Sequence, residues 1–260
     1  MTLPTTNQYA VYPSLRDRVV VVTGGASGIG EAIVEAFAMQ HARVVLLDIQ
    51  QDAGEALVQR MADKGYPKPS FHLCDLTDTP ALQRTVAAIV EAFDGVDVLV
   101  NNAGDDMRHS IEEVTPESWD RSIALNLKHQ FFMIQSVIPS MRKRGGGSII
   151  NMSSIGWVIP STNVPVYVTA KAAIVGMTRT LAHELGVDNI RVNSVMPGAI
   201  QTEKQKRLWL TEAYTAEVLG RQALKRLLVP EEVARLVLFL AADDSSAITN
   251  QSYIVDGGWV

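Results

Sequence analysis

The feature that most constrains this chain is the run VVVVTGGASGIG at residues 19–30. Four consecutive valines predict a strand that is buried on both faces, as in the interior of a parallel sheet. Glycines follow with the spacing TGxxxGxG, and Ile33, Val34 and Phe37 then recur at helical spacing. Strand, glycine turn and helix in succession are typical of a phosphate cradle, because glycines let the backbone approach a pyrophosphate and free amides at the helix start face its charge. The alternative is an ordinary tight turn.

Strands and helices continue to alternate along the rest of the chain. Further strands are expected at 43–48, 70–74, 96–100, 148–152, 190–195 and 252–255, and helices at 53–63, from 78 onward, around 123–138 and at 166–185, with a further helix-start signal at 115–117. This alternation predicts a Rossmann-type α/β fold, a single domain with a three-layer, doubly wound parallel sheet over residues 15–260. The polar residues 1–14, which include two prolines, are expected to form an N-terminal arm on the surface.

The composition of the 260 residues argues against several classes of partner and site. A net charge of −5 gives no reason to expect nucleic acid or an anionic membrane as a partner, and the single Cys74 excludes an intrachain disulfide framework. Residues 1–13 lack the pattern of a signal peptide, and no apolar run is long enough to cross a bilayer, so we expect a cytoplasmic protein. The histidines at 41, 72, 129 and 183 show no metal-ligand spacing, and we expect no metal site.

Asp48 closes the second expected strand and lies 18 residues after Gly30. An acid at this distance is typical of a residue that accepts hydrogen bonds from the adenosine ribose of a dinucleotide. Because a carboxylate there would repel a ribose phosphate, Asp48 favours NAD over NADP. The alternative is a helix cap, a common role for an aspartate at a strand end.

Tyr167 and Lys171 are four residues apart within one expected helix, so their side chains share a face. A nearby ammonium group lowers the pKa of a phenol and makes proton transfer practical. Ser154 follows the strand at 148–152, and the loop at 101–104 follows another strand. In an open α/β sheet these strand ends meet in one crevice, so we expect the three side chains to lie together there. Taken singly, the pair is a common helix-surface arrangement and the serine a common turn residue.

Together these motifs resemble the short-chain dehydrogenase/reductase family over residues 15–260. The matching residues are TGGASGIG at 23–30, NNAG at 101–104, Asn126, Ser154, YVTAK at 167–171 and Pro197-Gly198. The resemblance implies that Tyr167 is the general acid and base and that Ser154 orients the reacting hydroxyl. It also implies that Lys171 lowers the pKa of Tyr167 and holds the nicotinamide ribose, and that Asn126 supports a water that relays the proton.

The resemblance further implies NAD as the cofactor. Its expected contacts lie on the glycine turn, at the strand ends and after Pro197: Gly24, Ser27, Gly28, Ile29, Gly30, Asp48, Ile49, Asp75, Leu76, Asn102, Ala103, Gly104, Tyr167, Lys171, Pro197, Gly198, Ile200 and Thr202.

A narrower resemblance is to the aldose 1-dehydrogenase branch of that family. It rests on residues 105–109, 143–147, 154–157, 201–205 and 257–259. The resemblance implies a substrate lid near 199–225 and a homotetramer. The alternative for the lid segment is a plain pair of surface helices. Sugar hydroxyls need charged and amide partners to replace their bonds to water. The candidate substrate contacts are Asp105, Asp106, Arg108, His109, Ser154, Asn163, Tyr167 and Gln201, with the indole of Trp157 for the C–H face of a sugar ring.

We therefore expect an enzyme that uses NAD to oxidise the anomeric hydroxyl of an aldose to the aldonolactone. The aldose is a pentose or hexose such as L-arabinose, D-xylose, D-galactose or L-fucose. One alternative is an NAD(P)-dependent ketoreductase that acts on a keto-acyl or sugar-derived ketone. An alternative of another class is a redox sensor that binds the dinucleotide without catalysis.

Overall fold

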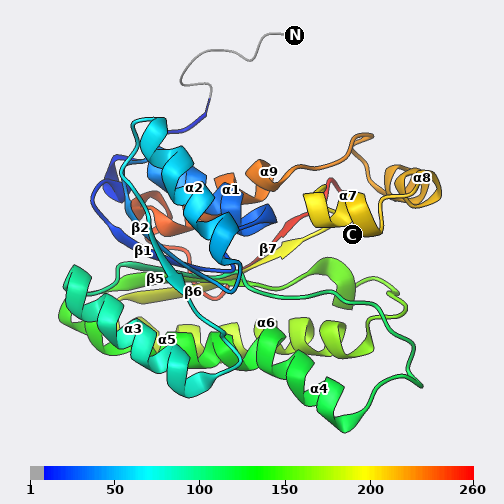
Figure 1. Ribbon diagram of the computed structural model, residues 1–260, viewed down its shortest axis with the longest axis horizontal. Helices are drawn as coiled ribbons and strands as arrows, with labels where there is room; N and C mark the ends of the chain where they lie inside the picture. Colours follow the sequence, from blue (N-terminus) through cyan, green and yellow to red (C-terminus); the bar gives the residue numbers. More distant parts are fainter. Residues whose placement is uncertain (1–8) are drawn as a thin grey trace.

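A parallel sheet of seven strands forms the centre of the computed structural model, which describes residues 9–260 (Figure 1). The spatial order is β3-β2-β1-β4-β5-β6-β7, and every neighbouring pair is parallel. The strands are β1 (Val19–Thr23), β2 (Arg43–Asp48), β3 (Ser70–Leu73), β4 (Val98–Asn101), β5 (Gly147–Met152), β6 (Ile190–Pro197) and β7 (Ser252–Val255). The predicted parallel α/β fold is confirmed. Of the predicted arm at 1–14, residues 1–8 lie outside the described part of the chain.

Helices cover both faces of the sheet and give three layers (Figure 1). α1, α2 and α9 lie on one face, and α3, α4, α5 and α6 lie on the other. The helices are α1 (Gly28–Met39), α2 (Gln51–Asp63), α3 (Thr79–Phe93), α4 (Pro116–Ile123), α5 (His129–Lys143), α6 (Pro165–Leu185), α7 (Glu203–Leu208), α8 (Glu212–Arg221) and α9 (Pro230–Ala241). Shorter helical turns are η1 (Pro13–Leu15), η2 (Ala124–Lys128), η3 (Ile155–Trp157), η4 (Gly186–Asp188) and η5 (Asp243–Ser245).

The valines of β1 show why the strand needs apolar residues at every position. Val20 and Val22 pack into the core beneath α1 and α9, where Phe37 is fully buried. Val19 and Val21 pack into the second core, beneath α3 and α5. Because successive side chains of a strand point to opposite faces, a strand covered on both faces alternates between two cores rather than between core and solvent.

The helix expected around 123–138 is longer and less regular than predicted. It begins as α4, where Thr115 accepts a hydrogen bond from the amide of Ser118 at 3.2 Å and so caps the first turn. The chain passes through the π-helical turn η2 into α5, which continues past Pro139 to Lys143. Met141 is fully buried beyond that proline, and its packing stabilises the last turn. The start signal at 115–117 and the helix predicted around 123–138 therefore belong to one continuous helical segment, α4, η2 and α5 in succession.

The strand order creates a crevice at one edge of the sheet. The chain moves outward from β1 to β2 and β3 and then returns to place β4 on the other side of β1. The loops that follow β1 and β4 therefore diverge, and ligands of open α/β sheets bind where this happens. α7 and α8 lie beyond the end of β6 on this side (Figure 1). Within residues 9–260, no helix has the length and apolar character that crossing a bilayer requires.

Candidate active site

A cleft of about 1710 Å³ opens at the carboxyl ends of the strands. Ligand pockets are usually about 300–1,000 Å³, so this cleft has room for a dinucleotide and a second small molecule. All the predicted cofactor contacts except Gly30 line it. Of the predicted substrate contacts, those that line it are Asp105, Asp106, Arg108, Ser154 and Tyr167.

The glycine turn has the shape of a phosphate cradle. Gly24 and Gly28 adopt φ angles of +63° and +59°, which side chains disfavour. Gly30 is needed for packing rather than contact, because a Cβ there would overlap the carbonyl oxygen of Gly24 and lie 2.6 Å from Asn102 Nδ2. The Asn102 amide donates to that carbonyl at 3.0 Å. One side of the glycine turn therefore faces the cleft, and the other side is hydrogen-bonded to the loop after β4.

Thr23 adds two hydrogen bonds between the end of β1 and the loop after β4, although no site role was predicted for it. Its hydroxyl accepts hydrogen bonds from the backbone amides of Asn102 at 3.0 Å and Ala103 at 3.1 Å. Only the pairing of β1 with β4 brings Thr23 to that loop. The two walls of the crevice therefore hold a fixed spacing.

Asp48 lies beside the glycine turn and lines the cleft. Its carboxylate accepts hydrogen bonds from the amide of Ala26 at 2.9 Å and the amide of Gln50 at 3.0 Å. The side chain is 6% exposed, and Ile49 next to it is 67% exposed. Gln50, rather than Asp48, occupies the N-cap of α2, so the helix-cap alternative does not describe this aspartate. The carboxylate therefore lies in a fixed orientation beside the glycine turn.

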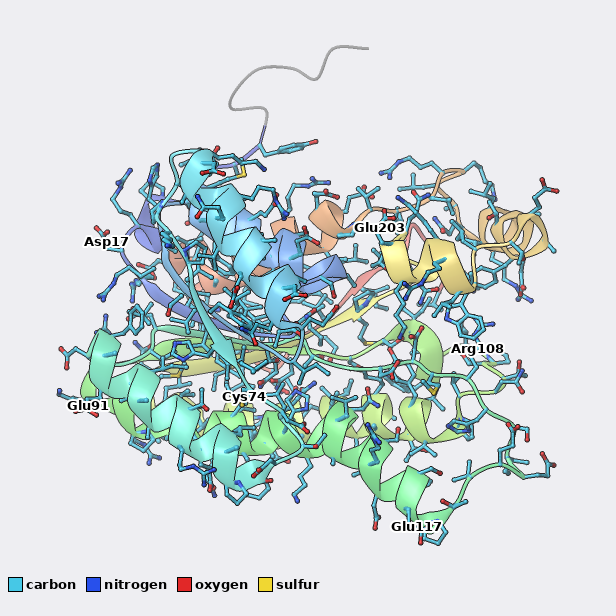
Figure 2. The ribbon with its side chains drawn as sticks, viewed as in Figure 1. Asp17, Cys74, Glu91, Arg108, Glu117 and Glu203 are labelled. Carbon is cyan, nitrogen blue, oxygen red and sulfur yellow. The ribbon has the colours of Figure 1, made fainter. Side chains whose placement is uncertain are left out.

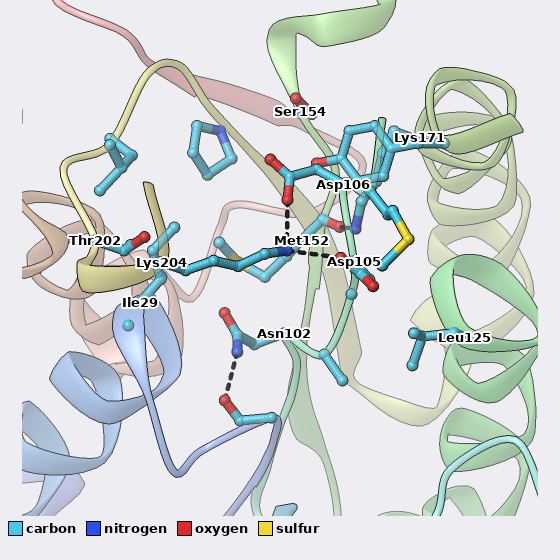
Figure 3. Close-up of a pocket in the computed structure, with 18 of the residues that line it drawn as sticks. Ile29, Asn102, Asp105, Asp106, Leu125, Met152, Ser154, Lys171, Thr202 and Lys204 are labelled. Atoms are coloured by element: carbon cyan, nitrogen blue, oxygen red, sulfur yellow. Dashed lines mark hydrogen bonds and ion pairs between the residues drawn. The ribbon is translucent and has the colours of Figure 1, made fainter. Parts of the chain in front are cut away.

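Ser154, Tyr167 and Lys171 meet in the cleft as predicted. Ser154 precedes η3, and its hydroxyl accepts a hydrogen bond from the amide of Gly156 at 3.0 Å. Lys171 Nζ lies 5.5 Å from the ring centroid of Tyr167 on α6, and it donates to the carbonyl oxygen of Met152 at 2.9 Å. Figure 3 shows Ser154, Lys171 and Asp106 in the same space. This is a phenol, a hydroxyl and an ammonium group arranged for proton transfer.

The predicted lowering of the Tyr167 pKa by Lys171 is not what this structure gives. Burial, followed by the charge of Asp106, raises the pKa of Tyr167, and the hydrogen bond from Ser154 only partly opposes this. Burial also lowers the pKa of Lys171 to about 8, although the charge of Asp106 acts in the opposite direction. The prediction considered only the neighbour on the same helix face, whereas desolvation and a carboxylate from another loop dominate.

Asn126 lies in η2 and is buried. Its side-chain oxygen accepts the amide of Asp105 at 2.9 Å, and its nitrogen donates to the Asp105 carbonyl at 3.1 Å. The side chain therefore fixes the backbone of the loop after β4. A Cβ at Gly104 would lie 3.0 Å from Asn126 Oδ1 and 3.2 Å from Lys171 Nζ, so this glycine lets the loop lie close to both.

Lys204 and Gln205 of α7 were assigned no individual role from the sequence, yet both line the cleft. Lys204 Nζ lies 2.6 Å from Asp105 Oδ1 and 2.7 Å from Asp106 Oδ1 (Figure 3). Gln205 Nε2 donates to Asp106 Oδ2 at 2.7 Å. Nearly a hundred residues separate these partners in the chain, so no local pattern could have indicated the contact.

Four predicted substrate contacts, His109, Trp157, Asn163 and Gln201, do not line the cleft. The amide of His109 donates to the carbonyl of Asn163 at 2.8 Å, so these two residues join the loops behind the wall. Gln201 is held through its backbone, which donates to Leu228. Trp157 is 39% exposed in η3, and the indole that lines the cleft is Trp259.

Arg108 lines the cleft from the loop after β4, and Figure 2 shows it beside α7. Its guanidinium lies 4.4 Å from the ring centroid of Trp209 and 5.6 Å from that of Tyr214, a cation–π arrangement. Tyr214 lines the cleft as well. These contacts join the loop after β4 to α8 and to the connection between α7 and α8.

His129 is buried near Lys171. Burial, followed by the charge of Lys171, lowers the pKa of His129 to about 3, so the imidazole is neutral. Across residues 9–260, no group of three or more His, Cys, Asp or Glu side chains is arranged to hold a metal ion.

Comparison with known proteins finds dehydrogenases and reductases that are similar to this chain. A protein-family profile described as enoyl-(acyl carrier protein) reductase matches residues 24–260. The chain is 49% identical to the "Probable galactose dehydrogenase GalD" of Rhizobium meliloti, over 99% of both chains. It is 47% identical to the D-xylose 1-dehydrogenase of Caulobacter vibrioides, over 96% of this chain and 98% of that protein. The crystal structure of 3-oxoacyl-[acyl-carrier protein] reductase from Brucella melitensis superposes with a TM-score of 0.90 at 33% identity, covering 100% of this chain and 98% of that one.

The chain belongs to the short-chain dehydrogenase/reductase family. Members are oxidoreductases that use a nicotinamide dinucleotide. The residues present fit such a group, because the glycine turn, with Gly24 and Gly28 at positive φ, lines the cleft and the Asp48 carboxylate lies beside it.

Proposed function

We propose that this short-chain dehydrogenase oxidises the anomeric hydroxyl of a cyclic aldose, a pentose or hexose, to the aldonolactone with NAD. The observation that carries the proposal is the polar wall of Asp105, Asp106 and Lys204 in the same cleft as Tyr167. A substrate that loses many hydrogen bonds to water needs such groups at close range. Full-length similarity to proteins named galactose dehydrogenase and D-xylose 1-dehydrogenase supports the same substrate class.

In the proposed reaction Tyr167, as phenolate, takes the proton of the anomeric hydroxyl. Ser154 holds the hydroxyl oxygen in place, and Lys171 supplies positive charge next to the phenolate. When bound, the dinucleotide accepts the two electrons and the hydrogen that leave the anomeric carbon. Asn126 keeps the loop at Asp105 in position and, as we further propose, supports a water that returns the proton of Tyr167 to solvent.

We assign the proposed cofactor contacts to the successive parts of the dinucleotide. The glycine turn would hold the pyrophosphate, Asp48 and Ile49 the adenosine ribose, and Asp75 and Leu76 the adenine. Lys171, Ile200 and Thr202 would hold the nicotinamide half. The buried carboxylate of Asp48 supports NAD over NADP, since a ribose phosphate would lie next to a second negative charge.

The first experiment supplies NAD with a panel of aldoses and follows reduced cofactor by absorbance. We expect oxidation of at least one pentose or hexose. In Tyr167→Phe, turnover should fall by at least about 10²-fold while NAD still binds, because the variant lacks the proton acceptor. Tyr66→Phe, which changes a tyrosine outside the cleft, is the control. No turnover with any aldose would refute the proposal.

A ketoreductase is the second candidate. It is favoured by the family profile and by the Brucella reductase. Supplying reduced cofactor with keto-acyl thioesters and sugar-derived ketones tests it directly. A dinucleotide sensor without catalysis would bind NAD but show no effect of Tyr167→Phe in either assay.

We also propose a cytoplasmic homotetramer with a lid formed by the segment around α7 and α8. Apolar side chains near the C-terminus, such as Ile254, which is 45% exposed, support contacts between subunits. Light scattering coupled to gel filtration measures the assembly state directly.

A further inference from the structure

α7 reaches the loop after β4 through a cluster of charged and amide groups (Figure 3). Asp105 and Asp106 are adjacent, and both carboxylates contact Lys204. Two carboxylates held this closely repel each other unless a cation lies between them. Lys204 supplies that cation, and it therefore determines where both carboxylates point.

Asp106 has room for one more hydrogen bond. A carboxylate offers about four acceptor positions. The donors already present are Lys204, Gln205 and the backbone amide of Asp106 itself. About one acceptor position is left, on a side chain that lines the cleft. A hydroxyl group is the kind of donor that fits it.

This carboxylate lies close to the reacting groups. Figure 3 shows it beside Ser154 and Lys171 in the cleft, and its charge acts on both Tyr167 and Lys171. A small polyol that places one hydroxyl at Tyr167 can therefore offer a second hydroxyl to Asp106. A substrate with only one hydroxyl at the reacting carbon would leave Asp106 without this partner.

Both ends of the cluster are anchored. The backbone of Asp105 is held by Asn126 from beneath the cleft. Thr202 is the N-cap of α7, and its hydroxyl accepts from the amide of Gln205. A Cβ on Gly28 would lie 3.3 Å from the Thr202 methyl group. The ion pairs of Lys204 thus connect the cofactor cradle to the wall that carries Asp106.

We propose that Lys204 is a specificity-determining residue, which positions the Asp106 carboxylate to accept a hydrogen bond from a second hydroxyl of the substrate. The inference rests on the proposed sugar dehydrogenase function and deepens it. Lys204 does not touch the reacting atoms, so its effect falls on substrate binding and on discrimination between sugars. Neutral polyols with a hydroxyl near the reacting one are the favoured class.

The test compares Lys204→Met and Lys204→Arg with Lys206→Met. Lys206 lies on the same helix but pairs with the exposed Glu203, so it controls for charge loss on α7. KM and kcat are measured for the aldose that the wild type oxidises best and for each of its monodeoxy analogues. The dissociation constant of NAD is measured separately by fluorescence and also reports correct folding.

For Lys204→Met we expect KM to rise at least about 10-fold, because the substrate would lose one oriented hydrogen bond to Asp106. The NAD dissociation constant should stay within about twofold, since Asp48 and the glycine turn are unchanged. Lys204→Arg should recover part of the KM, because it restores the cation. In the wild type one monodeoxy analogue should be oxidised at least about 10-fold less efficiently, and this penalty should largely disappear in Lys204→Met.

Equal KM values in Lys204→Met and Lys206→Met would overturn the inference alone, with the sugar dehydrogenase function intact. The same holds if every monodeoxy analogue keeps its full penalty in Lys204→Met. A wild type that oxidises no aldose would refute the proposed function and this inference with it.

Discussion

Replacing Asp48 by asparagine should relax the preference for NAD over NADP. The carboxylate is buried, and it is fixed by the amides of Ala26 and Gln50 at 2.9 and 3.0 Å. Asparagine has the same shape, but its single oxygen can accept from only one of these amides, because Ala26 donates to Oδ2 and Gln50 to Oδ1. The substitution therefore removes the charge together with one of these two hydrogen bonds.

The magnitude follows from the charge that NADP adds. Two unit charges 4 Å apart repel by about 4 kcal/mol at an effective dielectric constant of 20, and by about 1 kcal/mol in water. Asp48 is 6% exposed but borders an open cleft, so a value of about 2.7 kcal/mol lies between these limits, and it corresponds to about 100-fold in affinity. Loss of the charge-assisted bond to the NAD ribose should weaken NAD by about a further 10-fold. The ratio of kcat/KM for NAD to that for NADP should thus fall by about 10²- to 10³-fold.

The assay measures initial rates with each dinucleotide at a saturating concentration of the best aldose. Asp52→Asn is the matched control, because Asp52 is an exposed acid in the first turn of the neighbouring helix α2. A ratio that changes no more in Asp48→Asn than in this control would refute the assignment of Asp48. The melting temperature of both variants checks that the glycine turn has kept its structure.

Three further perturbations test the site and the core. Asp106→Asn should lower the pKa of Tyr167, because the Asp106 charge raises it. Since the phenolate is the proposed reacting form, the rising limb of the pH profile of kcat/KM for oxidation should move to lower pH. An unchanged limb would contradict this. Gly30→Ala should weaken NAD binding at least about 10-fold, because the added Cβ would overlap the Gly24 carbonyl. Gly176→Ala, whose added Cβ would meet no other part of the chain within 4 Å, should leave binding unchanged. Equal NAD dissociation constants for the two variants would rule out the packing role of Gly30. Phe37→Ala should lower the free energy of unfolding by about 3–5 kcal/mol in urea titrations, since the ring is fully buried, and a loss below about 1 kcal/mol would mean that the ring is not part of the core.

Much of the fold was predictable because its signals are local. The β1 valines, the glycine turn and the start of α1 are contiguous in the chain, and their backbone preferences and burial agree. The predicted strands all occur, with ends that shift by a few residues. The helix through Asn126 differed in length, because buried contacts beyond Pro139 override the local signal to stop, and α9, which packs against α1, was not predicted.

The site was predictable where chemistry and spacing coincide within a segment. Tyr167 and Lys171 share a helix face, and Ser154 follows a strand end, so all three were expected in the crevice where they lie. The sign of the Tyr167 pKa shift was wrong, since it depends on burial and on Asp106, which approaches from another loop.

The sequence by itself determined the glycine turn that we propose holds the dinucleotide and the groups that we propose transfer the proton. Each of these depends on residues close together in the chain, whose geometry a strand, turn or helix sets directly. Only the tertiary structure decided which side chains form the rest of the cleft wall. It brought Lys204 to Asp105 and Asp106, placed Trp259 rather than Trp157 in the cleft, and stacked Arg108 on Trp209. These contacts join distant segments at the open end of the sheet, where packing of loops and of α7 and α8, rather than local backbone preference, sets the positions.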